Sequence, residues 1–298
     1  MKVAITGSNG LLGQTLVNLL LKNPDKYEVY GLSRGDNRSG RDDFTYYGID
    51  ITDYKELNSC LQEICPDFIV NTAAMTHVDV CEDDREGCDQ LNVEAVKYLT
   101  EISREINAHL IHISTDFIFD GKQGYYKETD IPNPLSYYGL SKLKSEEVLK
   151  DSTIDSTILR TILVYGQVNN LGRNNIVLWV KEMLENEKEI TIVDDQFRMP
   201  TYVEDLAMVC KISIDKKAKG IFNISSNELL SVYEIARQVA EVFNLDKNLI
   251  KPISTSTLNQ KAPRPPKTGF DLSKTNQELS FYPKSFKEDL HRFKESLI

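Results

Sequence analysis

Hydrophobic and polar positions form two kinds of segment in the first half of the chain. Short apolar runs are each followed by a longer segment in which apolar residues recur every three or four positions. Such short runs are typical of buried strands, and the longer segments are typical of helices with one buried face. We predict strands at residues 3–6, 28–32, 45–48, 68–72, 110–114 and 157–160, and helices at residues 11–22, 53–63, 92–107 and 136–149.

The order of these segments predicts the fold. Strands that alternate with helices favour a parallel sheet covered by helices on both faces. After residue 165 this rhythm loosens. We therefore predict an α/β fold, with a doubly wound parallel sheet in residues 1–165 and a smaller C-terminal lobe in residues 166–298, some segments of which return to the first domain. The later helices are predicted at 174–185, 204–214, 231–243 and 286–297, the later strands at 190–193 and 221–224, and a proline-rich loop at 262–266.

Length and charge restrict the partners. A chain of 298 residues can form one large α/β domain with a smaller companion. Its net charge of −10 repels phosphate backbones, so we expect no nucleic-acid partner. No apolar run is long enough to span a membrane, and the chain starts with a strand instead of a signal peptide. We expect a cytoplasmic protein without a membrane partner.

Cysteines and histidines give little support for a metal site. The five cysteines are odd in number and include no C-x-x-C pair, which favours reduced, mostly buried thiols over disulfides or zinc. His109 and His112 are three positions apart in a predicted strand, so their side chains would lie on opposite faces. We predict no bound metal.

A glycine-rich segment joins the first predicted strand to the first predicted helix. Gly7, Gly10 and Gly13 form a G-x-x-G-x-x-G pattern. Gly7 would allow a tight turn, Gly10 a close approach to a pyrophosphate, and Gly13 close packing of helix on strand. The alternative is a glycine-rich turn without special function, but the strand before it and the helix after it favour a Rossmann-type dinucleotide site. The other loop residues that we assign to this site are Asn9, Leu11 and Leu12.

The end of the second strand bears on the choice of cofactor. An acidic residue there usually holds the ribose 2′-hydroxyl of NAD, whereas this chain has Ser33 and Arg34. An arginine suits the 2′-phosphate of NADP(H), so we predict NADP(H) and keep NAD(H) as the alternative. Asp50, followed by Ile51, comes after the third strand. Asp50 could accept a hydrogen bond from the adenine amino group or cap the turn that follows, and we include both residues in the cofactor site.

Tyr138 and Lys142 are four positions apart on a predicted helix, so they share one face. A lysine beside a tyrosine favours the phenolate, and we expect Lys142 to lower the pKa of Tyr138. Thr115 lies at the end of a predicted strand, the sheet edge where ligands bind in doubly wound folds. The Tyr/Lys spacing alone could be a surface pair. Together with the glycine loop and Thr115 it indicates a catalytic site.

These motifs resemble those of an extended short-chain dehydrogenase/reductase, most closely the dTDP-4-dehydrorhamnose reductase group. The resemblance covers nearly the whole chain. The S-T-D-F-I-F and D-Q-F-R-M-P-T segments are the most specific to that group. The matching segments are residues 6–13, 71–74, 77–79, 114–119, 128–130, 134–142, 160–161, 195–201 and 264–265.

The resemblance implies roles for individual residues. Thr115 would hydrogen-bond the substrate carbonyl oxygen, Tyr138 would donate the proton, and Lys142 would hold the nicotinamide ribose and tune Tyr138. The activity implied is reduction of the 4-keto group of a nucleotide-linked 6-deoxy sugar. Asn92 would be either structural or part of a proton relay. The residues that would line the cofactor groove are Ala73, Ala74 and Met75, and those that would face the sugar include Val78 and Asp116.

Two further residues concern the substrate. The family often has a tryptophan that packs on the sugar where this chain has Leu163, which offers apolar contact without aromatic stacking. Arg264, in the proline-rich loop, could bind the diphosphate, because arginine forks suit phosphate oxygens. Its alternative is an arginine at the surface.

Other functions are compatible with the same motifs. The chain also resembles the regulatory β subunit of methionine adenosyltransferase, a non-catalytic protein that binds a dinucleotide. A sugar-nucleotide epimerase or dehydratase is a third hypothesis, although the acid pair that dehydratases place after the strand-end threonine is absent here. The exact sugar, the nucleotide base and the oligomeric state, for which a homodimer is one candidate, stay open.

Overall fold

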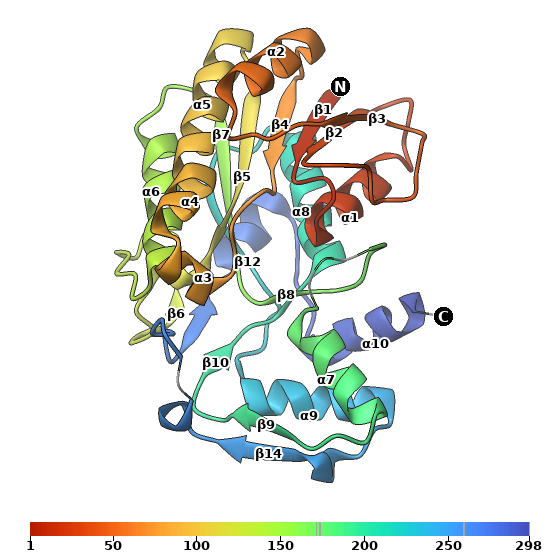
Figure 1. Cartoon of the computed structure of the whole chain (residues 1–298), viewed down its shortest axis with the longest axis vertical. Helices are drawn as coiled ribbons and strands as arrows, with labels where there is room; N and C mark the ends of the chain where they lie inside the picture. The colour runs from red at the N-terminus through yellow and green to blue at the C-terminus, as the bar shows by residue number, and fades with distance from the viewer. Residues whose placement is uncertain (171, 173, 259, 298) are drawn as a thin grey trace.

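A central sheet of seven parallel strands organises the structure, a computed structural model that describes residues 1–170, 172, 174–258 and 260–297. The strand order is β12-β7-β5-β4-β1-β2-β3 (Figure 1). The chain runs outward from β1 in one direction and then from β4 in the other, which confirms the predicted doubly wound sheet. The strands are β1 Lys2–Thr6, β2 Glu28–Ser33, β3 Thr45–Gly48, β4 Phe68–Asn71, β5 His109–Thr115, β7 Ser156–Thr161 and β12 Gly220–Ile224.

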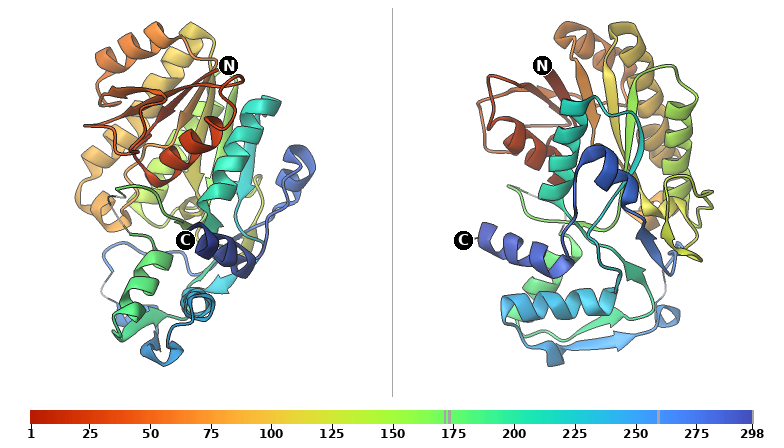
Figure 2. Two further views of the ribbon diagram at one scale, coloured as in Figure 1. Left: turned by 90° about the vertical axis from the view of Figure 1, so that its right-hand side faces the viewer. Right: turned by 180° about the vertical axis from the view of Figure 1, so that it is seen from behind.

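Helices cover both faces of this sheet because its central strands are apolar on both sides. Val3 and Ile5 pack toward α1 and α8, whereas Ala4 packs toward α2 and α5. The views from the side and from behind show α1 and α8 together on one face (Figure 2). The helices are α1 Leu11–Leu20 and α8 Val203–Lys216 on that face, and α2 Tyr54–Ile64, α5 Ala95–Ile106 and α6 Tyr137–Lys150 on the other.

Side chains fix where two of these helices begin. The Asp53 carboxylate accepts hydrogen bonds from the main-chain N–H groups of Lys55 and Glu56 and so caps α2. The Ser136 hydroxyl accepts from Gly139 N at the start of α6. The sequence therefore sets the start of the helix that carries Tyr138 and Lys142.

A smaller lobe lies below the sheet in Figure 1 and is built mostly from later segments. Its strands form short two-stranded pairs: β9 with β14, β10 with β13, β11 with β8, and β15 with β6. Its elements are α7 Ile176–Glu185, α9 Val232–Phe243, α10 Phe286–Ser296, β6 Gly124–Tyr126, β8 Val164–Tyr165, β9 Ile190–Val193, β10 Phe197–Arg198, β11 Thr201–Tyr202, β13 Leu230–Ser231, β14 Ile250–Ile253 and β15 Thr268–Phe270.

The helical segment between β4 and β5 is more broken than predicted. The helix predicted at residues 92–107 is preceded by two short helices and begins in a π-helical turn. π-Helical turns inside helices often occur at functional sites. The additional short helices are α3 Val78–Asp83, α4 Arg85–Asp89, the π-helical turns Gln90–Glu94 and Thr275–Leu279, and the 3₁₀ turns Asp116–Ile118, Lys247–Leu249 and Thr255–Thr257.

None of the helices in the described residues has the length and apolar character needed to cross a membrane.

Candidate active site

The glycine loop lies where α1 starts, beside the end of β4. Gly7 has a φ of +67°, and a Cβ there would lie 2.8 Å from Ala73 N. A Cβ on Gly13 would collide with the main-chain oxygen of Gly7. The tight turn at Gly7 and the close packing at Gly13 are therefore confirmed. Gly10 is the N-cap of α1 and provides no side-chain cap, so the first N–H groups of the helix are left for an anion.

Asn9 connects this loop to the segment after β2. Its Nδ2 donates to the main-chain oxygen of Asp36 and to the Tyr46 hydroxyl, both at 2.9 Å. Its Oδ1 accepts from Arg38 N at 2.9 Å. The contacts of Asn9 thus position the loop that carries Arg34 and Arg38. The neighbouring residues Leu11 and Leu12 form the first turn of α1, and Leu12 is buried in the core.

The end of β2 presents two exposed arginines. Ser33 is half-buried, and Arg34 is exposed with its guanidinium 3.8 Å from the Asp50 carboxylate. Arg38 is also exposed in this loop and was not predicted from the sequence. Its position four residues after Arg34 was the only indication that the sequence offered. Asp50 Oδ1 accepts hydrogen bonds from the main-chain N–H and the hydroxyl of Thr52. Asp50 therefore caps the turn, which is one of the two roles predicted for it. The next residue, Ile51, is buried in the core.

The predicted cofactor groove follows β4. Ala73, Ala74 and Met75 are half-buried there. Asn92 holds the main chain of Met75 on both sides, because its Oδ1 accepts from Met75 N at 2.8 Å and its Nδ2 donates to Met75 O at 3.0 Å. The same Nδ2 lies 3.0 Å from Ser141 Oγ on α6. These contacts are structural, which is one of the two roles predicted for Asn92.

Thr115 and Tyr138 meet at the carboxyl end of β5. Both side chains are almost fully buried. The Thr115 hydroxyl donates to Asp116 Oδ1 at 3.1 Å, and the Tyr138 ring packs edge-to-face on Phe117. Burial raises the pKa of Tyr138 far above its ordinary value, and a hydrogen bond with Thr115 offsets part of the rise.

Lys142 is buried on the same helix but does not control Tyr138 as expected. Its Nζ lies 3.0 Å from His112 Nε2. Burial lowers the pKa of Lys142 to about 8, although the nearby Glu146 and Cys88 act in the opposite direction. The pKa of Tyr138 is raised in this arrangement and not lowered as expected, because the desolvation of the phenol dominates.

A buried ion pair fixes α6 against the sheet. Arg160 on β7 donates from Nε and Nη2 to the two carboxylate oxygens of Glu146 at 2.9 and 2.7 Å. Ser114, next to Thr115, also donates to Glu146, at 2.6 Å. Glu146 follows Lys142 by one helical turn and lies on the same face of α6. These contacts therefore fix how α6 is rotated about its axis, with Tyr138 and Lys142 directed toward β5.

Asp116 is buried and has partners from the C-terminal half. Arg198 Nε lies 3.9 Å from its Oδ2, and the Thr268 hydroxyl donates to the same oxygen. Burial raises the pKa of Asp116, while Arg198 lowers it. Sequence reasoning placed Asp116 at the sugar and missed Arg198, which gave no signal beyond its place in the D-Q-F-R-M-P-T segment.

The remaining predicted substrate residues lie around this point. Val78 packs with Tyr138 in a small apolar cluster. Leu163 is half-buried and has a φ of +43°, in the left-handed region that side chains with a Cβ rarely adopt. Arg264 forms two short contacts with Asp79 on α3, Nη1 to Oδ1 at 2.6 Å and Nη2 to Oδ2 at 2.7 Å. Arg264 is therefore mostly buried and held by an ion pair, and the diphosphate role stays a prediction.

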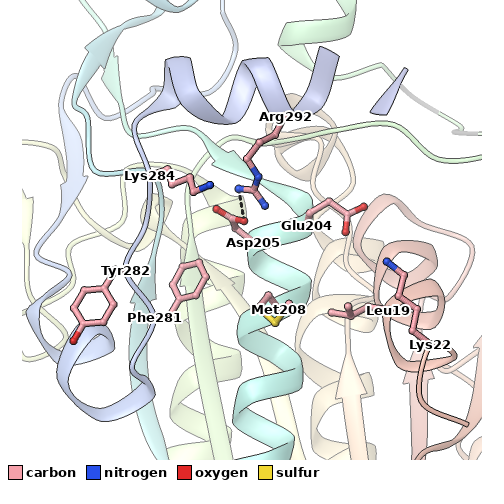
Figure 3. A pocket seen from close by; sticks show the side chains of 9 residues that line it. All are labelled: Leu19, Lys22, Glu204, Asp205, Met208, Phe281, Tyr282, Lys284 and Arg292. Carbon is pink, nitrogen blue, oxygen red and sulfur yellow. Dashed lines mark hydrogen bonds and ion pairs between the residues drawn. The ribbon is translucent and has the colours of Figure 1, made fainter. Parts of the chain in front are cut away.

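A hollow lies away from these residues. It has a volume of about 320 Å³ and is enclosed by α1, α8, α10 and the segment before α10 (Figure 3). Cations and carboxylates face each other in it, including the ion pair of Arg292 with Asp205 at 2.7 Å. None of the predicted site residues lines this hollow.

Cysteines and acidic residues form no metal centre in the part of the chain that the structure describes, where no group of three His, Cys, Asp or Glu side chains is placed to hold an ion. All five cysteines are free, and only Cys65 is exposed, which confirms the expected buried thiols.

The sequence matches known proteins over most or all of its length. The family model described as the RmlD substrate binding domain matches residues 1–298. The dTDP-4-dehydrorhamnose reductase of Aggregatibacter actinomycetemcomitans is 33% identical over 301 residues, which cover 97% of each protein. Methionine adenosyltransferase 2 subunit beta of Bos taurus is 32% identical over 278 residues, which cover 92% of this chain and 81% of that protein.

A solved structure agrees with the sequence relatives. The dTDP-4-dehydrorhamnose reductase of Bacillus anthracis, in complex with NADP, superimposes with a TM-score of 0.88 at 30% identity and covers 99% of both chains. The predicted resemblance is confirmed by these matches. The chain belongs to the RmlD substrate-binding domain family of extended short-chain dehydrogenases/reductases, which includes the dTDP-4-dehydrorhamnose reductases.

Proposed function

We propose that this protein is an NADP(H)-dependent reductase of the 4-keto group of a nucleotide-linked 6-deoxy sugar, with NAD(H) as the alternative cofactor. The observation that supports the proposal is the burial of three side chains: Thr115 at the end of β5, and Tyr138 and Lys142 on α6, the helix that packs against β5. The glycine loop lies at the same edge of the sheet, where the strand order reverses. The reductase relatives support the same reaction class.

The residues present fit a dinucleotide cofactor. The uncapped N-terminus of α1 would face the pyrophosphate, with Gly10 allowing a close approach. Arg34 and Arg38 would hold a 2′-phosphate from the end of β2. Asp50 would lie near the adenine. The half-buried residues Ala73, Ala74 and Met75 would form the wall of the groove toward the nicotinamide.

Three side chains would perform the proton chemistry. The cofactor supplies the hydride when it is bound. The Thr115 hydroxyl would hydrogen-bond the carbonyl oxygen, where negative charge develops, and Tyr138 would give that oxygen its proton. The raised pKa of Tyr138 suits this direction, because the phenol is protonated at neutral pH. Lys142, with a pKa of about 8, would replace the proton that Tyr138 loses.

The sugar nucleotide would lie between the sheet edge and the C-terminal lobe. Asp116 and Val78 would face the sugar, and Leu163 would provide apolar contact in place of an aromatic ring. Arg264 would bind the diphosphate while it remains anchored by Asp79. In this arrangement residues 1–165 bind the cofactor, and residues 166–298 mainly bind the substrate.

A direct assay tests the reaction. Purified protein is mixed with NADPH and dTDP-4-dehydro-β-L-rhamnose, and the loss of NADPH absorbance is followed; the assay is repeated with NADH. We expect consumption that requires the sugar nucleotide and is faster with NADPH. Net consumption also separates a reductase from an epimerase or dehydratase, which recycle their cofactor.

Tyr138→Phe identifies the proton donor. This variant should bind NADPH as the wild type does and lose turnover by roughly 10²-fold or more, since a positioned acid contributes that much. Tyr137→Phe is the matched control, because Tyr137 precedes it on α6 and its hydroxyl contacts Asp89 instead of Thr115. Wild-type turnover in Tyr138→Phe would disprove the assignment.

A second function is favoured by the 32% identity to the β subunit of methionine adenosyltransferase 2. In that case the protein would bind a dinucleotide and associate with a catalytic subunit without consuming NADPH. NADPH binding without ketone-dependent oxidation, together with co-elution of a methionine adenosyltransferase catalytic subunit from a size-exclusion column, would support this alternative.

A further inference from the structure

His112 is a fully buried histidine that contacts the candidate catalytic lysine. It lies on β5, three residues before Thr115. Its Nε2 is 3.0 Å from Lys142 Nζ and 3.0 Å from Ser145 Oγ, and both partners belong to α6. A buried imidazole with polar contacts on both ring nitrogens has its orientation and its tautomer set by these neighbours.

The Nδ1 side of the ring faces a donor. Asn71 Nδ2 lies 3.1 Å from His112 Nδ1. The orientation of the Asn71 amide is fixed, because its Oδ1 already accepts from the Thr6 hydroxyl at 2.6 Å and from Ala73 N at 3.3 Å. The amide NH₂ must therefore point at the ring, and His112 Nδ1 must be the acceptor. In a neutral imidazole this places the proton on Nε2.

The Nε2 side of the ring is consistent with that tautomer. The Ser145 hydroxyl donates its own hydrogen to Lys142 O at 2.7 Å, so its oxygen can accept from His112 Nε2–H. The Lys142 amine lies at the same distance from this nitrogen. An ammonium has only donors to offer, whereas a neutral amine has a lone pair that an N–H can reach. The ring therefore favours the neutral amine at this position.

Burial also favours the neutral amine of Lys142, and two neighbouring groups oppose it. Glu146 on α6 and Cys88 on α4 favour the ammonium, but Glu146 is already paired with Arg160. Tyr138 is protonated and uncharged at neutral pH. Burial, together with the charge of Lys142, lowers the pKa of His112 well below its ordinary value, so the ring stays neutral while Lys142 titrates.

We propose that His112 is a positioning residue for Lys142, a neutral imidazole locked in the Nε2–H tautomer that holds the amine on the turn after Tyr138 and lets it gain and lose a proton. It does not contact the reacting atoms itself. The statement about catalysis rests on the proposed function, whereas the statement about the tautomer and its coupling to Lys142 does not.

The tautomer is tested by NMR on the full chain with ¹⁵N-labelled histidine. The protein has four histidines, and the signals of His112 are identified by their loss in His112→Gln. We expect a neutral Nε2–H tautomer from about pH 5 to about pH 8, the range in which an unperturbed imidazole changes its charge. An Nδ1–H tautomer, or protonation of His112 between about pH 5 and pH 8, would overturn the proposal.

The coupling is tested in the same spectra. The His112 ¹⁵N shifts should change with a midpoint near the Lys142 pKa of about 8. This change should disappear in Lys142→Met, which keeps an unbranched chain and has no amine. A change that persists in Lys142→Met, or its absence in the wild type, would contradict the contact on which the proposal depends.

Activity variants separate positioning from mere packing. His109→Phe is the matched control, because His109 is also buried on β5 and its Nε2 contacts Thr157 at 2.8 Å, away from Lys142. We expect His112→Phe to lower kcat about tenfold beyond His109→Phe, the rate equivalent of one hydrogen bond, with little change in the KM for the sugar. Equal losses in the two variants would mean that His112 only fills the core.

The conservative variant adds a readout that packing does not move. His112→Gln should restore most of kcat and shift the alkaline limb of the pH profile upward, because an amide oxygen can accept from the ammonium form of Lys142. An unshifted limb in His112→Gln would overturn the proposal. If the wild type reduces no keto sugar, the proposed function fails while the NMR result still decides the role of His112.

Discussion

Burial sets the protonation states of the two residues that would handle the proton. It raises the pKa of Tyr138 far above its ordinary value and lowers the pKa of Lys142 to about 8, in each case by destabilising the charged form. At neutral pH the site therefore contains a protonated phenol beside an amine that is still mostly protonated. Both groups can then donate, which is the state that reduction of a ketone requires.

This state predicts the pH dependence of reduction. Lys142 loses its proton as the pH rises through about 8, so kcat/KM should fall along an alkaline limb with that midpoint. Lys142→Arg stays protonated throughout and should lose the limb, whatever its absolute rate. The profile is measured with NADPH and the keto sugar nucleotide at saturating cofactor. The same limb in Lys142→Arg would show that another group titrates.

Cofactor choice should also depend on single side chains. Arg34 is exposed at the end of β2, and its guanidinium lies 3.8 Å from the Asp50 carboxylate, a long contact, so we expect it to bind a 2′-phosphate. Arg34→Ala should raise the KM for NADPH about tenfold, as expected for one charged contact, and leave the KM for NADH nearly unchanged. Arg41→Ala is the control, because Arg41 in the same loop is paired with Asp43. Equal effects of Arg34→Ala on both cofactors would contradict the role in phosphate binding.

Residues with a local pattern were predictable from the sequence, and those defined by distant contacts were not. Thr115, Tyr138 and Lys142 follow from a strand end and a helical spacing. In the sequence, His112 is only a polar residue in an apolar strand, and Arg198 is only one residue of the D-Q-F-R-M-P-T segment. Their partners, Lys142 and Asp116, lie 30 and 82 positions away (142 − 112 and 198 − 116). Only the tertiary fold brings these pairs together.

At the scale of elements, α6 depends on the pair formed by Glu146 and Arg160. Both side chains are buried, and removing one charge leaves the other without compensation. Glu146→Gln should lower the free energy of unfolding by about 3 kcal/mol in urea titrations, near the low end for a broken buried pair. Glu147→Gln changes the exposed neighbour on the same helix and should stay within about 0.5 kcal/mol. Similar values for the two variants would mean that the ion pair contributes nothing net.

Element prediction succeeded where the hydrophobic period runs for several turns. The helices predicted at residues 53–63 and 136–149 begin within one residue of the observed starts at Tyr54 and Tyr137. It failed between β4 and α5, where α3 and α4 are each shorter than two turns and about half of their residues are charged. Too few apolar positions repeat there to indicate a helix, and Asn92 and Met75 stabilise the break through contacts that local sequence does not encode.

For the whole molecule, the C-terminal half contributes to the site through a few strong contacts. Arg264 and Lys261 pair with Asp79 and Asp83 on α3, and β15 pairs with β6. The sequence predicted a loop at these positions but not its partners, because a proline-rich segment carries no information about what it packs against. The same limitation applies to α10, whose amphipathic pattern was clear and whose contact with α8 was not.

The contact of α10 with α8 makes stability depend on pH. Asp289 is buried on α10, and Arg292 Nη1 donates to it at 2.6 Å and to Asp205 of α8 at 2.7 Å (Figure 3 shows the second pair). Burial and the charge of Asp205 raise the pKa of Asp289 to about 6 despite Arg292. The folded protein therefore holds this proton more tightly than the unfolded chain, whose aspartates titrate near pH 4. The stability that the proton provides is complete below about pH 4 and is lost as the pH rises through about 6.

Asp289→Asn should remove this dependence. The amide is neutral at every pH and can still accept from Arg292, so the variant should be more stable than the wild type at pH 8, by about 1–2 kcal/mol, and similar to it at pH 4. Glu295→Gln, which changes an exposed carboxylate on the same helix, should leave the pH profile of the wild type unchanged. Urea titrations at pH 4, 6 and 8 compare the three proteins. An Asp289→Asn variant that is less stable than the wild type at pH 8 would contradict this prediction. It would show that the ionised carboxylate is needed to anchor Arg292. The ion pair would then stabilise α10 by more than the buried charge destabilises it.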